Sequence, residues 1–299
     1  MALTVLLEAC STTPRTTDGG TDAGSTVVEP RFLDLRFRGV GETFSYVPFV
    51  GFGGGTSPGY PSGLATATAT GPGFGEGLFA SDFFEWFAVT YRDAGTYVTE
   101  VQWSGGACDS ILSDALNGGA TVLGLGGDPT RSDTTCTVLS VKPADGGADS
   151  AYMTGLSLGS SSIDFLNQQD FTRQYVVTAL SEVDAGLYAF VAQAHLTRNE
   201  QFENRWVLTP SEEVPAAADA LSDAGMVITA AAAGPSGIAL VGTRPTDGGF
   251  RRVAVTLQEE TVDPGPSFFA LIDGGFAPVA LLLQDLPDGG FRTVGIGQK

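Results

Sequence analysis

The sequence predicts an all-β fold, and the amino-acid composition is the first reason. Forty-one glycines and 16 prolines in 299 residues indicate a chain that turns often. Nineteen phenylalanines, together with many valines and threonines, favour strands over helices. Apolar residues make up 42% of the chain, which is enough for a sizeable core.

A recurring triplet, Asp-(Ala/Gly)-Gly, is the second reason. It lies mostly between apolar runs, as in "VVTALSEVDAGLYAFVAQA". The Asp side chain accepts hydrogen bonds from nearby backbone N–H groups and the last Gly adopts a positive φ at little cost, so the triplet predicts hairpin turns between antiparallel strands. The copies beyond the first thirty residues begin at Asp93, Asp145, Asp184, Asp223, Asp247, Asp273 and Asp288.

The spacing of these triplets predicts a β-propeller of about five to seven blades. Asp145, Asp184 and Asp223 follow one another at intervals of 39 residues. A propeller blade holds four strands in a period of about 40–50 residues. Residues 216–257 resemble a blade of the bacterial repeat propellers, and one or two β-sandwiches are the alternative fold. A propeller would close by pairing a first strand near 31–40 with the last strand near 291–296.

Only one stretch is a candidate helix. It is the short segment of residues 211–221, "SEEVPAAADAL", and Pro215 lies inside it. Because proline disrupts a helix interior, a loop is the alternative there.

The first ten residues end in a pattern that bears on location. "ALTVLL" is too short to span a bilayer, which needs about 20 apolar residues, but it suits the end of a signal peptide. "LEAC", residues 7–10, resembles the lipobox of bacterial lipoproteins; Glu8 and the missing basic residues before the apolar run depart from that pattern. The resemblance implies that Cys10 is diacylated after cleavage of the preceding residues.

The remaining chain divides into a tether and a folded body. Residues 11–30 consist mainly of Ser, Thr, Pro, Gly and Asp, and so have too little apolar surface to fold. We expect them to form a disordered tether. The alternation of apolar and polar residues in "RFLDLRFRGV" then predicts the first strand of a single all-β domain over residues 31–299.

The other two cysteines, Cys108 and Cys136, form an even pair once Cys10 is set apart. No C-x-x-C motif accompanies them, so we expect a disulfide, which requires an oxidising compartment, and we expect no metal site. Two buried free thiols are the alternative.

The net charge of −19, with only Lys142 and Lys299 as lysines, argues against nucleic-acid binding, which depends on neutralising phosphates. Attachment to anionic lipid through a basic patch is excluded on the same ground.

Two segments match the G-x-S-x-G spacing of a nucleophile elbow. At Ser57 the next residue is Pro58, which has no N–H to donate to an oxyanion, so that match fails. At Ser157 the order Ser157, Asp164 or Asp170, His195 is that of a hydrolase triad. The following "SSSIDF" is a poor helix start, and alternation places His195 on the polar face of its strand.

The expected function follows from location and fold. The sequence predicts a lipid-anchored protein of the bacterial cell envelope, at the outer membrane on its periplasmic or surface side. Its β-domain would bind a protein or glycan partner, or act as a scaffold, without catalysis and without a cofactor. A secreted hydrolase using Ser157 and His195 or a carboxylate pair, and a structural envelope component, are the alternatives.

Overall fold

The computed structural model describes residues 44–52, 60–61, 64–70, 83–91, 97–104, 108–126, 136–143, 150–158, 161–184, 186–195, 200–234, 237–248, 254–259, 265–285 and 291–298. These residues are rich in strands arranged as small, mainly antiparallel sheets, so the all-β prediction holds. The segment expected to be a tether and the segment expected to be the first strand lie outside the described residues.

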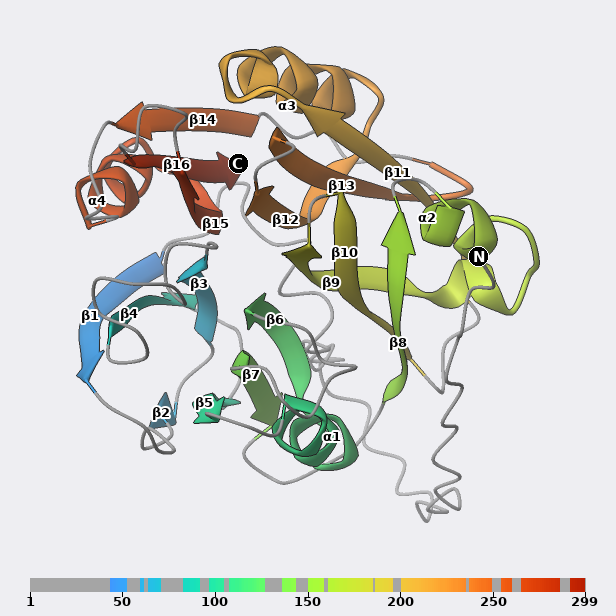
Figure 1. Ribbon diagram of the computed structural model, residues 1–299, viewed down its shortest axis with the longest axis horizontal. Helices are drawn as coiled ribbons and strands as arrows, with labels where there is room; N and C mark the ends of the chain where they lie inside the picture. Colours follow the sequence, from blue (N-terminus) through green and yellow to red (C-terminus); the bar gives the residue numbers. More distant parts are fainter. Residues whose placement is uncertain are drawn as a thin grey trace, which may run out of the picture.

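Four successive stretches of the chain repeat one order of elements: an outer strand, a helix, an inner strand and a middle strand (Figure 1). The middle strand pairs antiparallel with both others. The first stretch consists of β5 (Tyr97–Ser104), α1 (Cys108–Asn117), β6 (Thr121–Gly126) and β7 (Cys136–Pro143). The second consists of β8 (Ser150–Leu158), α2 (Ser161–Leu166), the short helix η3 (Thr172–Gln174), β9 (Val176–Asp184) and β10 (Leu187–His195).

The third and fourth stretches follow the same order. The third consists of β11 (Phe202–Thr209), the short helix η4 (Ser211–Glu213), α3 (Val214–Asp223), β12 (Val227–Gly234) and β13 (Gly237–Pro245). The fourth consists of β14 (Ala254–Glu259), α4 (Gly265–Asp273), β15 (Ala277–Asp285) and β16 (Phe291–Gln298).

A fifth group of strands comes from the N-terminal part of the described chain. Its outer, inner and middle strands are β1 (Phe44–Phe52), β3 (Leu64–Thr70) and β4 (Phe83–Tyr91). The two-residue strand β2 (Tyr60–Pro61), from the connection between β1 and β3, pairs with β5 at the outer edge of a different group.

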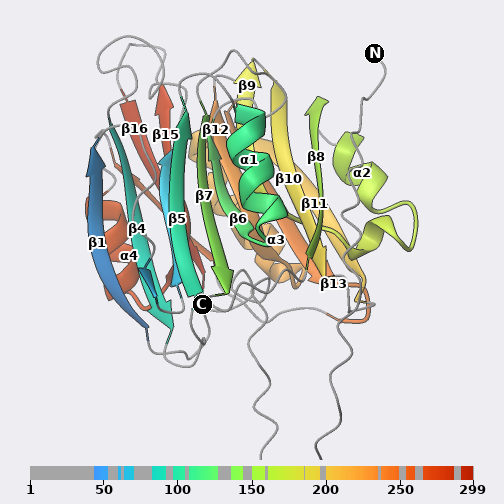
Figure 2. The same ribbon diagram turned by 90° about the horizontal axis from the view of Figure 1, so that it is seen from below.

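The five inner strands are neighbours in a cyclic order. β3 contacts β6, β6 contacts β9, β9 contacts β12, β12 contacts β15, and β15 contacts β3. Figure 1 shows the strand groups following one another around a common centre, and Figure 2 shows the strands side on. β15 and β3 pair in parallel, Leu281 opposite Ala69 and Leu282 opposite Thr70, which joins two groups into one six-stranded sheet.

Four inner strands carry a β-bulge at the same place. The pairing with the middle strand skips the third residue of β6, β9, β12 and β15, and these residues are Leu123, Thr178, Thr229 and Val279. A bulge bends its strand and increases the local twist. Its recurrence indicates that the four stretches are copies of one structural unit.

The hydrophobic core lies between neighbouring sheets. One cluster joins α1, β6 and β7 to Tyr152 of β8 and to β9 and β10. A second joins α2, β9 and β10 to β12 and β13, and a third joins α3, β12 and β13 to β15 and β16. Each of these clusters includes apolar side chains of one helix, such as Leu112, Leu166 and Leu221. The helices therefore fill space between neighbouring sheets. The alanines of β12 are buried in the same layers.

Three helices end in the same way, and this corrects the hairpin prediction for some triplets. Gly119, Gly225 and Gly275, after α1, α3 and α4, have φ of 78°, 73° and 76°. The N–H of the next residue bonds the carbonyl five positions back, for example Phe276 to Leu271 at 2.9 Å. This is the Schellman arrangement, which closes a helix C-terminus. The triplets at Asp223 and Asp273 therefore end helices.

The remaining triplets divide into hairpins and links. Asp184 and Asp288 lie between strands that pair with each other, β9 with β10 and β15 with β16, so the hairpin prediction is confirmed there. Asp93, Asp145 and Asp247 lie between strands of different sheets, so the prediction is wrong for them. The triplet predicts that the chain changes direction. Whether the change is a hairpin, a link between sheets or a helix end depends on the flanking elements and their partners.

Two other predictions are settled by the described elements. Residues 214–223 form α3, in which Pro215 occupies the first turn, where its missing N–H needs no helical partner. The proposed pairing of residues 31–40 with the last strand is wrong, because β14 and β15 occupy both edges of β16. β3 takes the place beside the C-terminal group instead.

Candidate functional site

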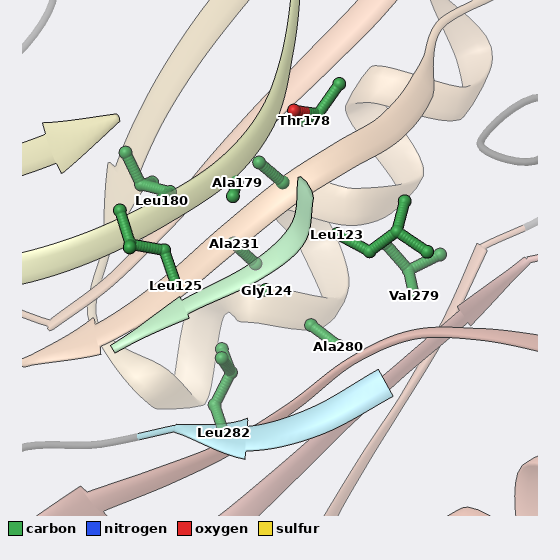
Figure 3. A pocket seen from close by; sticks show the side chains of 11 residues that line it. Leu123, Gly124, Leu125, Thr178, Ala179, Leu180, Ala231, Val279, Ala280 and Leu282 are labelled. Atoms are coloured by element: carbon green, nitrogen blue, oxygen red, sulfur yellow. The ribbon is translucent and has the colours of Figure 1, made fainter. Parts of the chain in front are cut away.

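The centre of the inner strands contains a small cavity of about 20 Å³ (Figure 3). Side chains from β6, β9, β12 and β15 line it, Leu125, Leu180 and Leu282 among them. A water molecule needs at least about 10–15 Å³, whereas sites for organic ligands measure about 300–1,000 Å³. This cavity is lined mainly by apolar side chains and is too small for an organic ligand.

The structure does not bring Ser157 and His195 together. In the β8–β10 ladder Ser157 lies opposite Tyr188, and His195 lies opposite Ser150. Seven residues of extended strand separate the two positions, which is about 23 Å at a rise of about 3.3 Å per residue. Proton transfer needs hydrogen-bond contact, at about 2.6–3.2 Å. These two residues therefore do not form a nucleophile–base pair.

The predicted cysteine sites are placed only in part. Cys108 is the first residue of α1, and Cys136 is the first residue of β7, opposite Ser104 at the end of β5. Their side chains are outside the described part of the molecule, so the disulfide stays a prediction. Cys10 lies outside the described residues altogether.

No metal site is apparent within the described ranges, because no three His, Cys, Asp or Glu side chains gather there. Among the same residues no helix is long and apolar enough to cross a membrane.

Amide side chains bind the backbone at three strand edges, and no pattern in the sequence indicates these contacts. Gln193 of β10 accepts from Val122 N–H at 2.8 Å and donates to the Ala120 carbonyl at 2.9 Å. Gln298 of β16 bonds the N–H and the carbonyl of Ile228 at 3.0 and 3.4 Å. In each case the amide takes the place that a neighbouring strand would occupy.

The third amide, Asn167, follows α2 and binds β11. Its Nδ2 donates to the Asn204 carbonyl at 2.7 Å, and its Oδ1 accepts from the Asn204 N–H at 3.0 Å. The Asn204 side chain in turn donates to the Tyr175 carbonyl and accepts from Thr243, at 3.0 and 2.9 Å. This buried network fixes α2 and η3 against β11.

Aromatic side chains gather where α2, η3 and β11 meet, at the right of Figure 1. We call this region the aromatic corner; it consists of Phe165, Phe171, Tyr175, Trp206 and Leu208. Phe171 is 52% exposed and Leu208 is 42% exposed, and they are the exposed large apolar side chains of the described residues. The other three are partly buried and pack against the core. Trp206 meets the ring of Tyr188 edge to face, with centroids 4.9 Å apart.

Phe171 is presented by a loop that hydrogen bonds hold rigid. The buried Thr172 hydroxyl donates to the carbonyls of Phe165 and Gln169, at 3.2 and 2.9 Å. Arg173 Nε donates to the Asn167 carbonyl at 2.9 Å. An exposed aromatic ring on a preorganised loop loses little conformational entropy when a partner covers it.

Two tyrosines, Tyr175 in this corner and Tyr188 beside it, are held in the neutral form. Burial raises the pKa of Tyr175. Burial also raises the pKa of Tyr188, and the negative charge and hydrogen bond of Glu182, whose Oε2 lies 3.3 Å from the phenol oxygen, raise it further. Neither side chain therefore ionises near neutral pH.

The charged groups of β11 pair with each other and with Arg244 of β13. Arg244 donates two hydrogen bonds to Glu203 Oε2, at 2.9 and 2.6 Å, and a third to the Ala224 carbonyl at the end of α3. Arg205 lies 3.5 Å from the same carboxylate. These pairs are about one-third exposed or more, so they orient the strand more than they stabilise it.

Comparison of the chain with models of protein families, with curated proteins and with solved structures found no match.

Proposed function

We propose that this chain is a lipid-anchored protein of the bacterial envelope whose folded part is a five-bladed β-propeller. In this proposal the propeller binds a partner or acts as a scaffold, and it does not catalyse a reaction.

The cyclic contacts of the five inner strands support the propeller. Each strand group has its inner strand at the centre and its outer strand at the rim, as a blade does. Apolar clusters that include a helix lie between neighbouring groups, and the four stretches from β5 to β16 repeat one order of elements. Repetition of a unit that buries its faces against its neighbours is the physical basis of a propeller.

The aromatic corner carries the proposal of a binding function. The axial cavity is too small for an organic ligand, and Ser157 and His195 are not adjacent, whereas the described residues expose Phe171 on a hydrogen-bonded loop and Leu208 on β11. Aromatic residues concentrate at the centres of protein interfaces. A surface that recognises a partner is therefore the better supported use of this fold.

The lipobox-like residues and the polar stretch after them support the anchor. A lipid on Cys10, followed by twenty residues of polar chain, would leave the domain about 25 Å of average reach from the membrane.

Metabolic labelling tests the anchor. Cells that express the protein from its natural gene are fed an alkyne analogue of palmitate, and we expect label on the wild type and none on Cys10→Ser. Cys108→Ser is the matched control and should keep the label. Equal labelling of the wild type and Cys10→Ser would refute the anchor.

A further inference from the structure

From Asn204 to Thr209, hydrogen bonds of the described residues cover the outer edge of β11 only at Asn204. Among the described strands β11 pairs with β13 alone, in an unbroken register from Phe202 opposite Pro245 to Thr209 opposite Ile238. The backbone groups of successive strand residues point alternately toward the partner strand and away from it. Because Asn167 holds both the N–H and the carbonyl of Asn204, the even-numbered residues of β11 direct these groups away from β13.

Pro245 agrees with this assignment. It lies opposite Phe202, another even-numbered residue, and proline has no N–H to contribute to a ladder. The backbone groups of Trp206 and Leu208 therefore point outward as well, beyond the end of the cover that Asn167 provides.

Where the described residues form no hydrogen bond to this edge, the surface includes exposed apolar side chains. Leu208 is 42% exposed, and Phe171 is 52% exposed on the loop that contacts β11. Proteins usually protect free strand edges with charges, proline or a covering segment, because such an edge pairs readily with another chain. Here Asn167 binds Asn204 and Arg205 adds a charge, whereas the next three residues, from Trp206 to Leu208, are apolar.

The same molecule contains a precedent for pairing at this kind of edge. β5 is the outer strand of its own sheet, as β11 is of its sheet. The extended residues Tyr60 and Pro61 add to β5 opposite Thr99 and Val98. A short extended segment from elsewhere is thus accommodated at an equivalent outer strand.

From these observations we infer that the β11 edge from Trp206 to Thr209 is a strand-addition site for an extended segment of a partner protein. The segment supplies backbone hydrogen bonds to Trp206 and Leu208 and covers the exposed Leu208 side chain with an apolar side chain of its own. Asp164 and Asp170 are exposed on the same corner. The exposed cation Arg205 lies 3.5 Å from Glu203, and the chain carries a net charge of −19, so the segment is basic at its polar positions. This inference rests on the proposed binding function and names the class of partner.

The test uses the full chain and a short synthetic peptide that alternates valine with lysine and threonine. A second peptide has the same side chains but carries N-methyl groups on alternate residues, which removes the N–H groups from one edge. We expect saturable binding of the first peptide by calorimetry, slower amide hydrogen exchange in the segment that contains Trp206 and Leu208, and no binding of the methylated peptide.

Variants of the protein locate the site. Leu208→Ser should weaken peptide binding about fivefold, because part of an apolar contact is lost. Ala216→Ser, at an exposed position on α3, is the matched control and should bind like the wild type. Thermal unfolding verifies that both variants are folded.

Several results would overturn the inference. The first peptide could fail to bind saturably, or the methylated peptide could bind equally well. Slower amide hydrogen exchange confined to other strands, or unchanged binding in Leu208→Ser, would also overturn it. Self-association that Leu208→Ser abolishes would overturn it in favour of a second copy of the chain. Because Cys10 labelling does not involve β11, failure of this inference and failure of the anchor are distinguishable.

Discussion

At the scale of single residues, glutamine side chains connect neighbouring strand groups. Gln193 lies opposite Val176, the first residue of β9, and Gln298 lies opposite Ala277, the first residue of β15. From these equivalent places each amide binds the inner strand of the preceding group: Gln193 binds β6, and Gln298 binds β12. A single side chain therefore satisfies a donor and an acceptor of a strand edge that would otherwise be buried without partners.

The stability of the contact between β6 and β10 should depend on Gln193. In Gln193→Leu the Val122 N–H and the Ala120 carbonyl lose their partner in a buried environment, and each such group costs about 1–3 kcal/mol. We expect the free energy of unfolding in urea to fall by about 2–5 kcal/mol. Gln168→Leu, at an exposed position, should change it by less than about 0.5 kcal/mol. Equal effects of the two substitutions would contradict the role of Gln193.

These contacts could not be predicted from the sequence. Gln193 and Val122 are separated by 71 residues, and Gln298 and Ile228 by 70, so no local pattern relates them. The candidate triad failed for a related reason. Its order along the chain was suitable, but an antiparallel ladder placed Ser157 and His195 at opposite ends.

At the scale of elements, the Asp-(Ala/Gly)-Gly triplet shows what a local pattern can and cannot predict. A helix C-terminus and a hairpin both need a residue with positive φ, and glycine supplies it at Gly225 after α3 and at Gly186 in the β9–β10 hairpin. The sequence therefore predicted the places where the chain turns. It did not distinguish the two uses, because that depends on whether the preceding residues form a helix or a strand.

Three described helices, α1, α2 and α4, were not predicted for a similar reason. They are short, and α1, "CDSILSDALN", mixes apolar and polar residues that also suit a loop. Its apolar residues Leu112, Ala115 and Leu116 form one face, and that face is buried against two sheets. Tertiary packing, more than helix propensity, stabilises such a segment.

The end of α4 provides a test of the helix-capping assignment. Gly275 has φ of 76°, and a Cβ there would contact nothing within 4 Å, so Gly275→Ala introduces backbone strain alone. We expect a loss of about 1–2 kcal/mol in the free energy of unfolding. Gly248→Ala is the matched control, since its Cβ would also lie in open space without a positive φ, and it should be neutral or slightly stabilising. A loss as large in Gly248→Ala would show that the φ at Gly275 is not the cause.

At the scale of the whole molecule, the core consists of several similar apolar clusters between sheets and not of one central cluster. Three apolar clusters lie between successive sheets, and the axial residues are largely small or apolar. The composition predicted strands and frequent turns, which the described residues confirm. The intervals of 39 residues between triplets were misleading, because the triplets at Asp145, Asp184 and Asp223 are a link, a hairpin and a helix end. Equivalent places, such as the ends of α3 and α4 at Asp223 and Asp273, are 50 residues apart.

The pairing of β3 with β15 unites segments more than 200 residues apart in the chain, and the proposed propeller requires it for closure. Ala69 lies opposite Leu281, and adjacent strands are about 4.8 Å apart, within the range of Cα separations that a disulfide spans. We therefore expect Ala69→Cys with Leu281→Cys to form an intramolecular disulfide under oxidation, identified as a linked peptide by mass spectrometry. Ala65→Cys with Leu281→Cys is the out-of-register control. Its cysteines would be about 13 Å apart along the strand, so it should not link. If both cysteine pairs link equally, or if Ala69→Cys and Leu281→Cys do not link, β3 does not pair with β15 in this register. Linkage of the in-register pair alone would support the proposed closed, five-bladed arrangement.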